Sequence, residues 1–225
     1  MESFCPLHID LKERKSLVIG GGSVAERKVK TLLDYGADLT VVSPELNSPL
    51  RELFNTGKIS YLDDIYRPAY LKDKFLVICA TDDQEVNRQA ADHCIERGIL
   101  VNSVSEPDRC TFFFPALLKK GPLTVAVSTA GSSPALSRRI KEQLDGYFGQ
   151  EYEIYLSYLG EIRPRIIARV TDKAARREIF EYLAGDEFFA KFKEMSPLEI
   201  DGLVEEMLAE KETAGGDDRP GEGRS

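Results

Sequence analysis

The segment Lys15-Ser-Leu-Val-Ile-Gly-Gly-Gly-Ser-Val-Ala25 decides the fold of this chain. Its apolar run ends in glycines, and residues 24–35 then place apolar side chains at the spacing of one helical face. Gly36 is typical of a helix end, and Leu39-Thr-Val-Val42 follows as a second apolar strand. A strand, a glycine turn, a helix and a strand within about 30 residues predict a βαβ unit with parallel strands.

The same alternation continues to about residue 110. Residues 75–80 are continuously apolar, as a parallel strand covered on both faces requires. A helix over 83–97 is expected next, capped by Asp82 or Asp83. The remaining expected elements are a helix at 51–56 and strands at 59–62 and 99–104. Together they predict an α/β fold, a Rossmann-like doubly wound parallel sheet, over residues 1–110.

The pattern changes beyond residue 110. Residues 111–115 and 123–128 are rich in β-formers, and Ser133-Pro134 is typical of a helix start. That helix is expected to reach about residue 148, and further helices are expected at 151–168, 172–184, 186–194 and 197–211. The expected organisation is a sheet domain (1–110), a small α+β domain (111–148), a helical domain (149–211) and a disordered tail (212–225).

Composition excludes several classes of protein. The chain has 225 residues, enough for one large domain or two small ones with a real core. No apolar run approaches the roughly 20 residues that span a bilayer, and no secretory leader opens the sequence, so a cytoplasmic protein is expected. A formal charge of −8 argues against a nucleic-acid binder. Four dispersed cysteines and two histidines predict reduced core thiols and no metal site.

The glycine turn matches the pattern G-x-G-x-x-A at Gly20, Gly22 and Ala25. The first glycine permits the tight turn, the second lets the backbone approach a pyrophosphate, and the alanine lets helix pack on strand. Backbone N–H groups of Gly22, Ser23 and Val24 are expected to face the phosphates, with the helix dipole behind them. A tight turn can require glycine for steric reasons alone, but its place between strand and helix favours a dinucleotide.

The residues that would contact the ribose are less typical. Ser43-Pro44-Glu45 stands where an acidic residue usually ends the second strand, although a simple strand end explains Ser43-Pro44 as well. Ser43 or Glu45 could bond a ribose hydroxyl, and no Lys or Arg is there to hold a 2′-phosphate, so NAD is favoured over NADP. Ala80-Thr81 closes the next long strand at the edge of the sheet where ligands of such folds bind.

Several stretches resemble one family. They are Gly20-Gly-Gly-Ser-Val-Ala-Glu-Arg-Lys28, Ala80-Thr-Asp-Asp83 with Val86-Asn87, Val101-Asn-Ser-Val104, Phe114-Pro115 and Val125-Ala-Val-Ser-Thr-Ala-Gly-Ser-Ser-Pro134. This set is similar to precorrin-2 dehydrogenase, the family that includes the N-terminal half of multifunctional siroheme synthase and a fungal dehydrogenase/ferrochelatase. The resemblance covers residues 1 to about 190.

The resemblance implies NAD⁺-dependent oxidation of precorrin-2 to sirohydrochlorin, in siroheme or cobalamin synthesis, and a cofactor contact at Asn102. Some members of the family also insert Fe²⁺, and no methyltransferase module follows here. It further implies that residues 111–148 form a dimerisation domain. A homodimer is also expected because Phe112-Phe113-Phe114 and Val125-Ala-Val127 are too apolar for a free sheet edge.

The chain departs from the family pattern at one carboxylate. The family carries an aspartate shortly after the Val-Asn-x-Val strand, and Ser105 stands there instead. Glu106 and Asp108 are candidate replacements; alternatively, none replaces it and a well-placed NAD⁺ suffices for hydride transfer. Metal insertion must remove protons from pyrrole nitrogens, so the loss of this carboxylate should impair it more than it impairs hydride transfer. We therefore expect dehydrogenation to be retained and metal insertion to be weak or absent.

A polycarboxylate substrate agrees with the local charge. Residues 107–178 hold 12 Lys and Arg against 8 Asp and Glu, a net charge of +4 inside an acidic chain. Ordinary solvated helix faces explain any single one of these residues equally well. The candidate substrate contacts are Ser128, Thr129, Ser132, Arg138 and Arg139.

Two other functions stay open. An NAD-sensing regulatory module of a potassium transporter has similar length and the same glycine turn. Such a module normally keeps the acid after the second strand, however, and needs neither residues 125–134 nor the basic helical region. A degenerate, non-catalytic binding protein is the third reading, kept open by Ser105.

Overall fold

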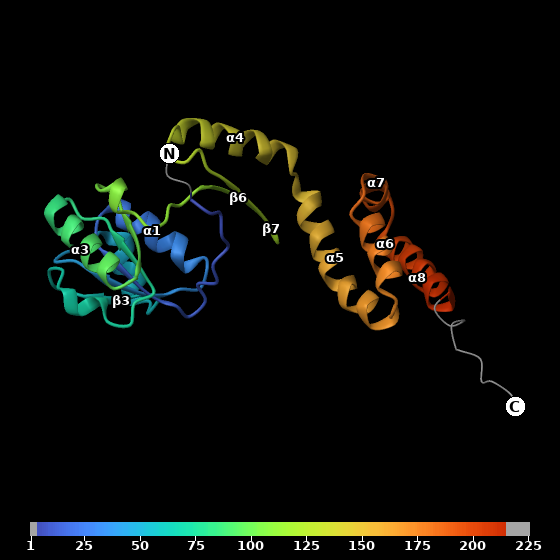
Figure 1. Cartoon of the computed structure of the whole chain (residues 1–225), viewed down its shortest axis with the longest axis horizontal. Coiled ribbons are helices and arrows are strands. Elements are labelled where there is room, and N and C mark those ends of the chain that lie inside the picture. The colour runs from blue at the N-terminus through green and yellow to red at the C-terminus, as the bar shows by residue number, and fades with distance from the viewer. Residues whose placement is uncertain (1–3, 215–225) are drawn as a thin grey trace, which may run out of the picture. The chain divides into compact units, whose positions relative to one another are not determined.

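The computed structural model describes residues 4–214, which form two compact units that divide between Phe114 and Pro115 (Figure 1). The division follows the predicted end of the sheet domain by a few residues. Phe112 and Phe114 extend the first unit because their rings pack against its core. No helix within residues 4–214 has both the length and the apolar character needed to cross a membrane.

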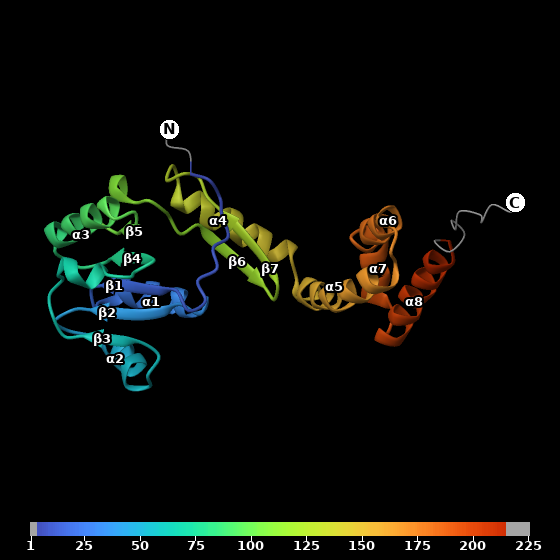
Figure 2. The same ribbon diagram turned by 60° about the horizontal axis from the view of Figure 1, so that its bottom comes forward.

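The first unit is built on a parallel five-stranded sheet of order β3-β2-β1-β4-β5 (Figure 2). Its strands are β1 (Lys15–Ile19), β2 (Asp38–Val42), β3 (Ser60–Leu62), β4 (Leu76–Cys79) and β5 (Leu100–Ser103). In the register of the central strands, Val18 of β1 lies beside Val41 of β2 and Ile78 of β4. The strand order therefore reverses between β1 and β4, which confirms the predicted Rossmann-like doubly wound sheet.

Helices cover both faces of this sheet, because successive strand residues point to opposite sides. Val18 packs on the side of α1 (Ser23–Leu33) and α2 (Ser48–Asn55). Leu17 packs on the side of α3 (Gln84–Glu96). Two short 3₁₀ turns, η1 (Pro68–Leu71) and η2 (Pro107–Arg109), complete the unit.

Helix caps explain where the predicted boundaries were inexact. Helix α2 begins before the predicted residue 51 because Asn47 caps it: its Oδ1 accepts a hydrogen bond of 3.0 Å from the Leu50 N–H. At α3 the cap is Asp83 rather than Asp82. Its Oδ1 accepts from the N–H groups of Glu85 and Val86.

The second unit opens with an antiparallel hairpin of β6 (Ala116–Lys120) and β7 (Leu123–Val127), followed by α4 (Pro134–Tyr147). Ser133 caps α4 as predicted, since its Oγ accepts from the Leu136 N–H at 3.2 Å. The expectation of a strand over 111–115 was wrong. The strand starts at Ala116, and the aromatic run before it contributes rings to the core of the first unit.

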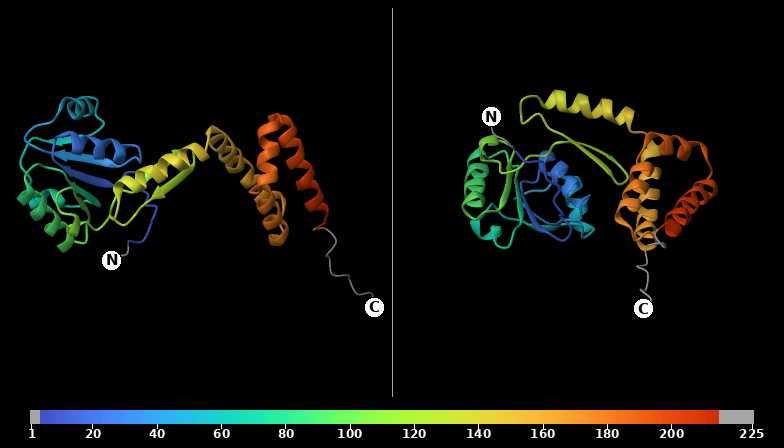
Figure 3. Two further views of the ribbon diagram at one scale, coloured as in Figure 1. Left: turned by 90° about the horizontal axis from the view of Figure 1, so that it is seen from above. Right: turned by 45° about the vertical axis from the view of Figure 1, so that its right-hand side comes forward.

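Four helices follow, and α6, α7 and α8 gather beside α5 (Figure 3). They are α5 (Gln150–Arg169), α6 (Lys173–Leu183), α7 (Asp186–Glu194) and α8 (Pro197–Ala214). The predicted tail began too early: α8 continues through residues 212–214, because the Glu212 carboxylate pairs with Arg169 of α5, Nε to Oε1 2.7 Å. Residues 215–225 lie outside the described residues, and the division of this unit at residue 148 stays a prediction.

Candidate functional site

A cleft of about 650 Å³ lies in the first unit, at the carboxyl ends of β1, β2 and β4. This volume suits a cofactor site. The position, where the strand order reverses, is also where ligands of open α/β sheets bind. Its lining comes from segments 19–24, 42–47, 64–66 and 80–83, together with Val86.

The three glycines of the turn serve different purposes. Gly20 has a φ of +121°, and a Cβ there would lie 2.3 Å from the Ala80 carbonyl oxygen. A Cβ on Gly21 would lie 1.8 Å from the Glu45 carbonyl oxygen, whereas a Cβ on Gly22 would meet nothing within 4 Å. The fold therefore requires Gly20 and Gly21, and Gly22 leaves open space in the cleft. The role of Gly21 was missed, because it depends on a loop distant in sequence.

The amino end of α1 faces this space. Its N-cap, Gly22, provides no side-chain hydrogen bond, so the first N–H groups, on Ser23 and Val24 among others, remain available to an anion. The loop after β2 is fastened to this turn: the Asn47 N–H donates to the Gly21 carbonyl at 2.9 Å, and Asn47 Nδ2 donates to Glu26 at 2.8 Å. These features fit a dinucleotide pyrophosphate.

The wall beside the glycine turn is acidic. Ser43 is buried directly after β2, and Pro44 and Glu45 are exposed at the rim of the cleft. Within the described part of the chain no Lys or Arg contributes to the lining. A hydrogen bond from Tyr70, followed by the Arg67 guanidinium, lowers the pKa of Asp64 and keeps it charged. The carboxylates that line the cleft are Glu45, Asp64, Asp82 and Asp83.

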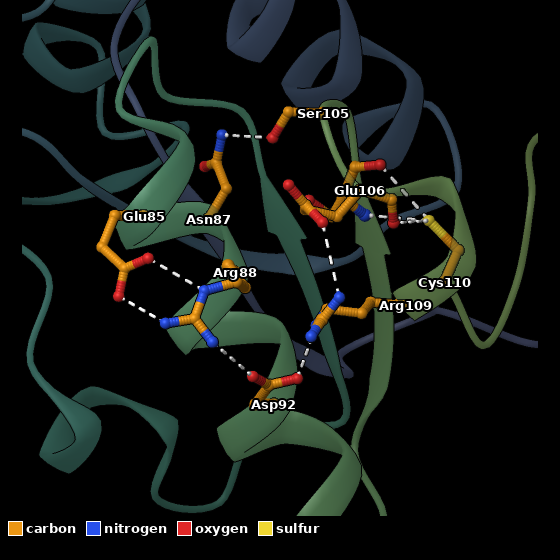
Figure 4. Close-up of polar contacts among 9 residues, drawn as sticks. Glu85, Asn87, Arg88, Asp92, Ser105, Glu106, Arg109 and Cys110 are labelled. Atoms are coloured by element: carbon orange, nitrogen blue, oxygen red, sulfur yellow. Dashed lines mark hydrogen bonds and ion pairs between the residues drawn. The ribbon is translucent and has the colours of Figure 1, made fainter.

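A buried amide connects the cleft to the loop after β5. Asn87 of α3 is fully buried, and its Oδ1 accepts from the Thr81 N–H at 3.1 Å. Its Nδ2 donates to the Thr81 carbonyl at 2.8 Å. The same nitrogen donates to Ser105 Oγ at 3.1 Å (Figure 4). The sequence had given Asn87 no role. An amide beside Ala90 and Ala91 on a buried helix face was the signal that could have identified it.

The candidate catalytic residues lie on the loop after β5. Glu106 is held beside Ser105 by Arg109, with 3.5 Å between Oε2 and Nη1, and Arg109 Nε contacts Asp92 at 2.7 Å (Figure 4). Asp108 is exposed on η2. Of the two candidate carboxylates, Glu106 is therefore the one whose position is fixed by neighbours.

Several candidates do not line the cleft, among them the catalytic candidates Ser105, Glu106 and Asp108. Asn102 lies outside it: this side chain is buried, and its Nδ2 donates to the Phe112 carbonyl at 3.1 Å. The candidate substrate residues belong to the second unit. There Ser128 Oγ accepts from the Ala130 N–H, and Thr129 Oγ1 accepts from the Ser133 N–H. The other three, Ser132, Arg138 and Arg139, are exposed.

The cysteines are free thiols; Cys79 and Cys94 are buried, as expected of core thiols, whereas Cys5 is exposed. Burial raises the pKa of the Cys94 thiol to about 12. Cys110 is buried as well, and its Sγ accepts from the Ser103 N–H at 3.2 Å. Among residues 4–214, no three His, Cys, Asp or Glu side chains come together as a group that could hold a metal ion.

Comparison with known proteins identifies two successive segments. Residues 7–116 match the family model described as "Putative NAD(P)-binding", and residues 120–146 match "Sirohaem biosynthesis protein central". Siroheme synthase 3 of Aeromonas hydrophila is 34% identical over 95% of this chain and 46% of its own length. A siroheme synthase of Tolumonas auensis is 40% identical over 79% of this chain and 38% of its own.

The chain thus spans less than half the length of these curated relatives. A solved structure titled SirC, precorrin-2 dehydrogenase, superposes with a TM-score of 0.77 at 29% identity, covering 92% of this chain and all of that one. The family matches run from the segment with the glycine turn into the hairpin region, and the superposed structure covers residues of both units. The chain belongs to the siroheme biosynthesis family in which an NAD(P)-binding domain is followed by this central domain.

Proposed function

We propose that this chain is a cytoplasmic, NAD-dependent dehydrogenase that oxidises precorrin-2 to sirohydrochlorin in siroheme synthesis. The observation that carries the proposal is the cleft at the strand-order reversal, with open space at Gly22 before an uncapped helix. The similarity continues beyond the NAD(P)-binding domain into residues 120–146. A potassium-transporter module would not need that segment, so the dehydrogenase is favoured. Free buried thiols fit the cytoplasm.

Different residues of the cleft would contact different parts of the cofactor. N–H groups of Gly22, Ser23 and Val24 hold the pyrophosphate, while Ser43 or Glu45 bonds the ribose. The acidic lining repels a 2′-phosphate, which supports NAD over NADP. When bound, the nicotinamide ring accepts a hydride from the substrate.

The first test measures the oxidation of enzymatically made precorrin-2 under anaerobic conditions, with either NAD⁺ or NADP⁺. The change in absorbance during the reaction gives the rate. We expect oxidation with NAD⁺ and a kcat/KM at least about tenfold higher than with NADP⁺, equivalent to about 1.4 kcal/mol. Binding of NAD⁺ without oxidation of precorrin-2 would instead support the hypothesis of a degenerate, non-catalytic binding protein. Preference for NADP⁺ would contradict the role of the acidic lining.

Metal insertion is expected to be weak, because Ser105 cannot accept a proton at neutral pH as a carboxylate does. A Ser105→Asp variant should insert Fe²⁺ into sirohydrochlorin at least about tenfold faster than the wild type. If Glu106→Ala abolishes both oxidation and insertion, Glu106 is the displaced general base. Robust insertion by the wild type that survives Glu106→Ala combined with Asp108→Ala would defeat the carboxylate argument.

We also propose a homodimer formed through the hairpin region. The polycarboxylate macrocycle contacts Ser128, Thr129, Ser132, Arg138 and Arg139. Fe²⁺ would be a second substrate only to the weak extent stated above. Phe112 and Phe114 do not support a dimer, since their rings lie against the core of the first unit. The apolar β7 strand still supports it. Sedimentation at micromolar concentration distinguishes dimer from monomer.

A further inference from the structure

The amide of Asn87 can be oriented in only one way. The Thr81 N–H can only donate, so the amide atom at 3.1 Å from it is the oxygen. The Thr81 carbonyl can only accept, so the amide atom at 2.8 Å from it is the nitrogen. The second hydrogen of that nitrogen faces Ser105 Oγ at 3.1 Å, and Ser105 is therefore the acceptor in this bond.

This direction fixes what the Ser105 hydroxyl can still do. Its own hydrogen has no acceptor among residues 4–214, and the side chain is only half-buried, so that hydrogen remains available to a ligand. A hydroxyl that accepts a hydrogen bond also becomes a better donor, because hydrogen bonds in a chain polarise one another. A carboxylate at this position would accept from Asn87 as well, but it would have no hydrogen to offer.

We propose that Ser105 donates a hydrogen bond to an acceptor oxygen of the bound ligand, and that Asn87 is the positioning residue that sets this direction. Thr81, which Asn87 holds on its other side, lines the cleft, so Asn87 connects Ser105 directly to a loop of the cofactor cleft, although Ser105 itself is not among the residues that line it. The acceptor oxygen belongs to the nicotinamide carboxamide or to a substrate carboxylate. Only the second source rests on the proposed function.

Three variants test this inference. Ser105→Ala removes the donor, Ser105→Thr keeps it, and Asn87→Asp offers only acceptors, which turns the Ser105 hydrogen inward. We expect Ser105→Ala and Asn87→Asp each to weaken one ligand by about tenfold, the value of one hydrogen bond, and Ser105→Thr to restore binding to within about threefold. In the Ser105→Ala background, Asn87→Asp should cause no further loss of affinity, since both act through one hydrogen.

The two sources are separated by titrating the full chain with NAD⁺ alone and with sirohydrochlorin alone. Weaker NAD⁺ binding assigns the acceptor to the carboxamide, and weaker sirohydrochlorin binding assigns it to the macrocycle. These readouts need no turnover, so they remain informative even if precorrin-2 is not oxidised. Unchanged affinity for both ligands in Ser105→Ala, or a loss in Ser105→Thr equal to that in Ser105→Ala, overturns the proposal. Thermal melts identify an Asn87→Asp variant that fails to fold, and the Ser105 pair then decides alone.

Discussion

A Gly22→Val variant is expected to fold normally and to lose measurable binding of NAD⁺. The backbone of Gly22 has a φ of −88° and a ψ of −171°, an extended conformation that valine adopts readily. A Cβ there meets no atom within 4 Å, so the fold tolerates it, but the side chain fills the space into which a pyrophosphate must come. The dissociation constant should rise at least about 100-fold, equivalent to about 2.7 kcal/mol.

Calorimetric titration with NAD⁺, together with a thermal melt, checks this prediction. Gly160→Val in α5 is a matched control, since a Cβ at Gly160 also meets open space and valine is a better helix former than glycine. The control should bind NAD⁺ as the wild type does. Unchanged affinity in a folded Gly22→Val protein would remove the glycine turn from the cofactor site.

Gly21→Ala is expected to destabilise the first unit by about 3 kcal/mol, within the range of severe overpacking. The new Cβ would lie 1.8 Å from the Glu45 carbonyl oxygen and 2.9 Å from Ser43 Oγ. The loop cannot easily move away, because the Asn47 N–H is bonded to the Gly21 carbonyl itself.

Urea unfolding of Gly21→Ala beside Gly22→Ala measures this effect at two adjacent glycines. The methyl group at Gly22 enters open space, so that variant should keep its unfolding free energy to within about 0.5 kcal/mol. Equal stability of the two variants would show that the loop over residues 43–47 is not fixed against the turn.

Local pattern was enough to predict the βαβ unit, because strand and helix periodicity and the glycine turn are all contained in neighbouring residues. All five predicted strands of the first unit are present, and their bounds needed only small changes around the buried runs. The lining of the cleft by Gly22, Ser43 and Thr81 followed from that order, since the carboxyl ends of parallel strands share one edge.

The remaining features depend on contacts between distant parts of the sequence. Gly21 is required by the backbone of Glu45, and the buried amide of Asn87 acquires its role only from Thr81 and Ser105. The pairing of Glu212 with Arg169 holds α8 helical beyond the predicted residue 211. No periodicity within one segment encodes such contacts, which is why the sequence predicted these positions incompletely or assigned them no role.

The loops after β4 and β5 are connected by the uncharged amide of Asn87, whereas Glu106 is held by a series of ion pairs. Asp92 lies between Arg88 and Arg109 in this series, which is partly exposed. Dissolved ions screen such exposed pairs but have little effect on a neutral, partly buried hydrogen bond such as that from Asn87 to Ser105. Raising the ionic strength should therefore release Glu106 while Ser105 stays in place. The dependence of the reaction rate on salt concentration should then distinguish the contributions of these two residues.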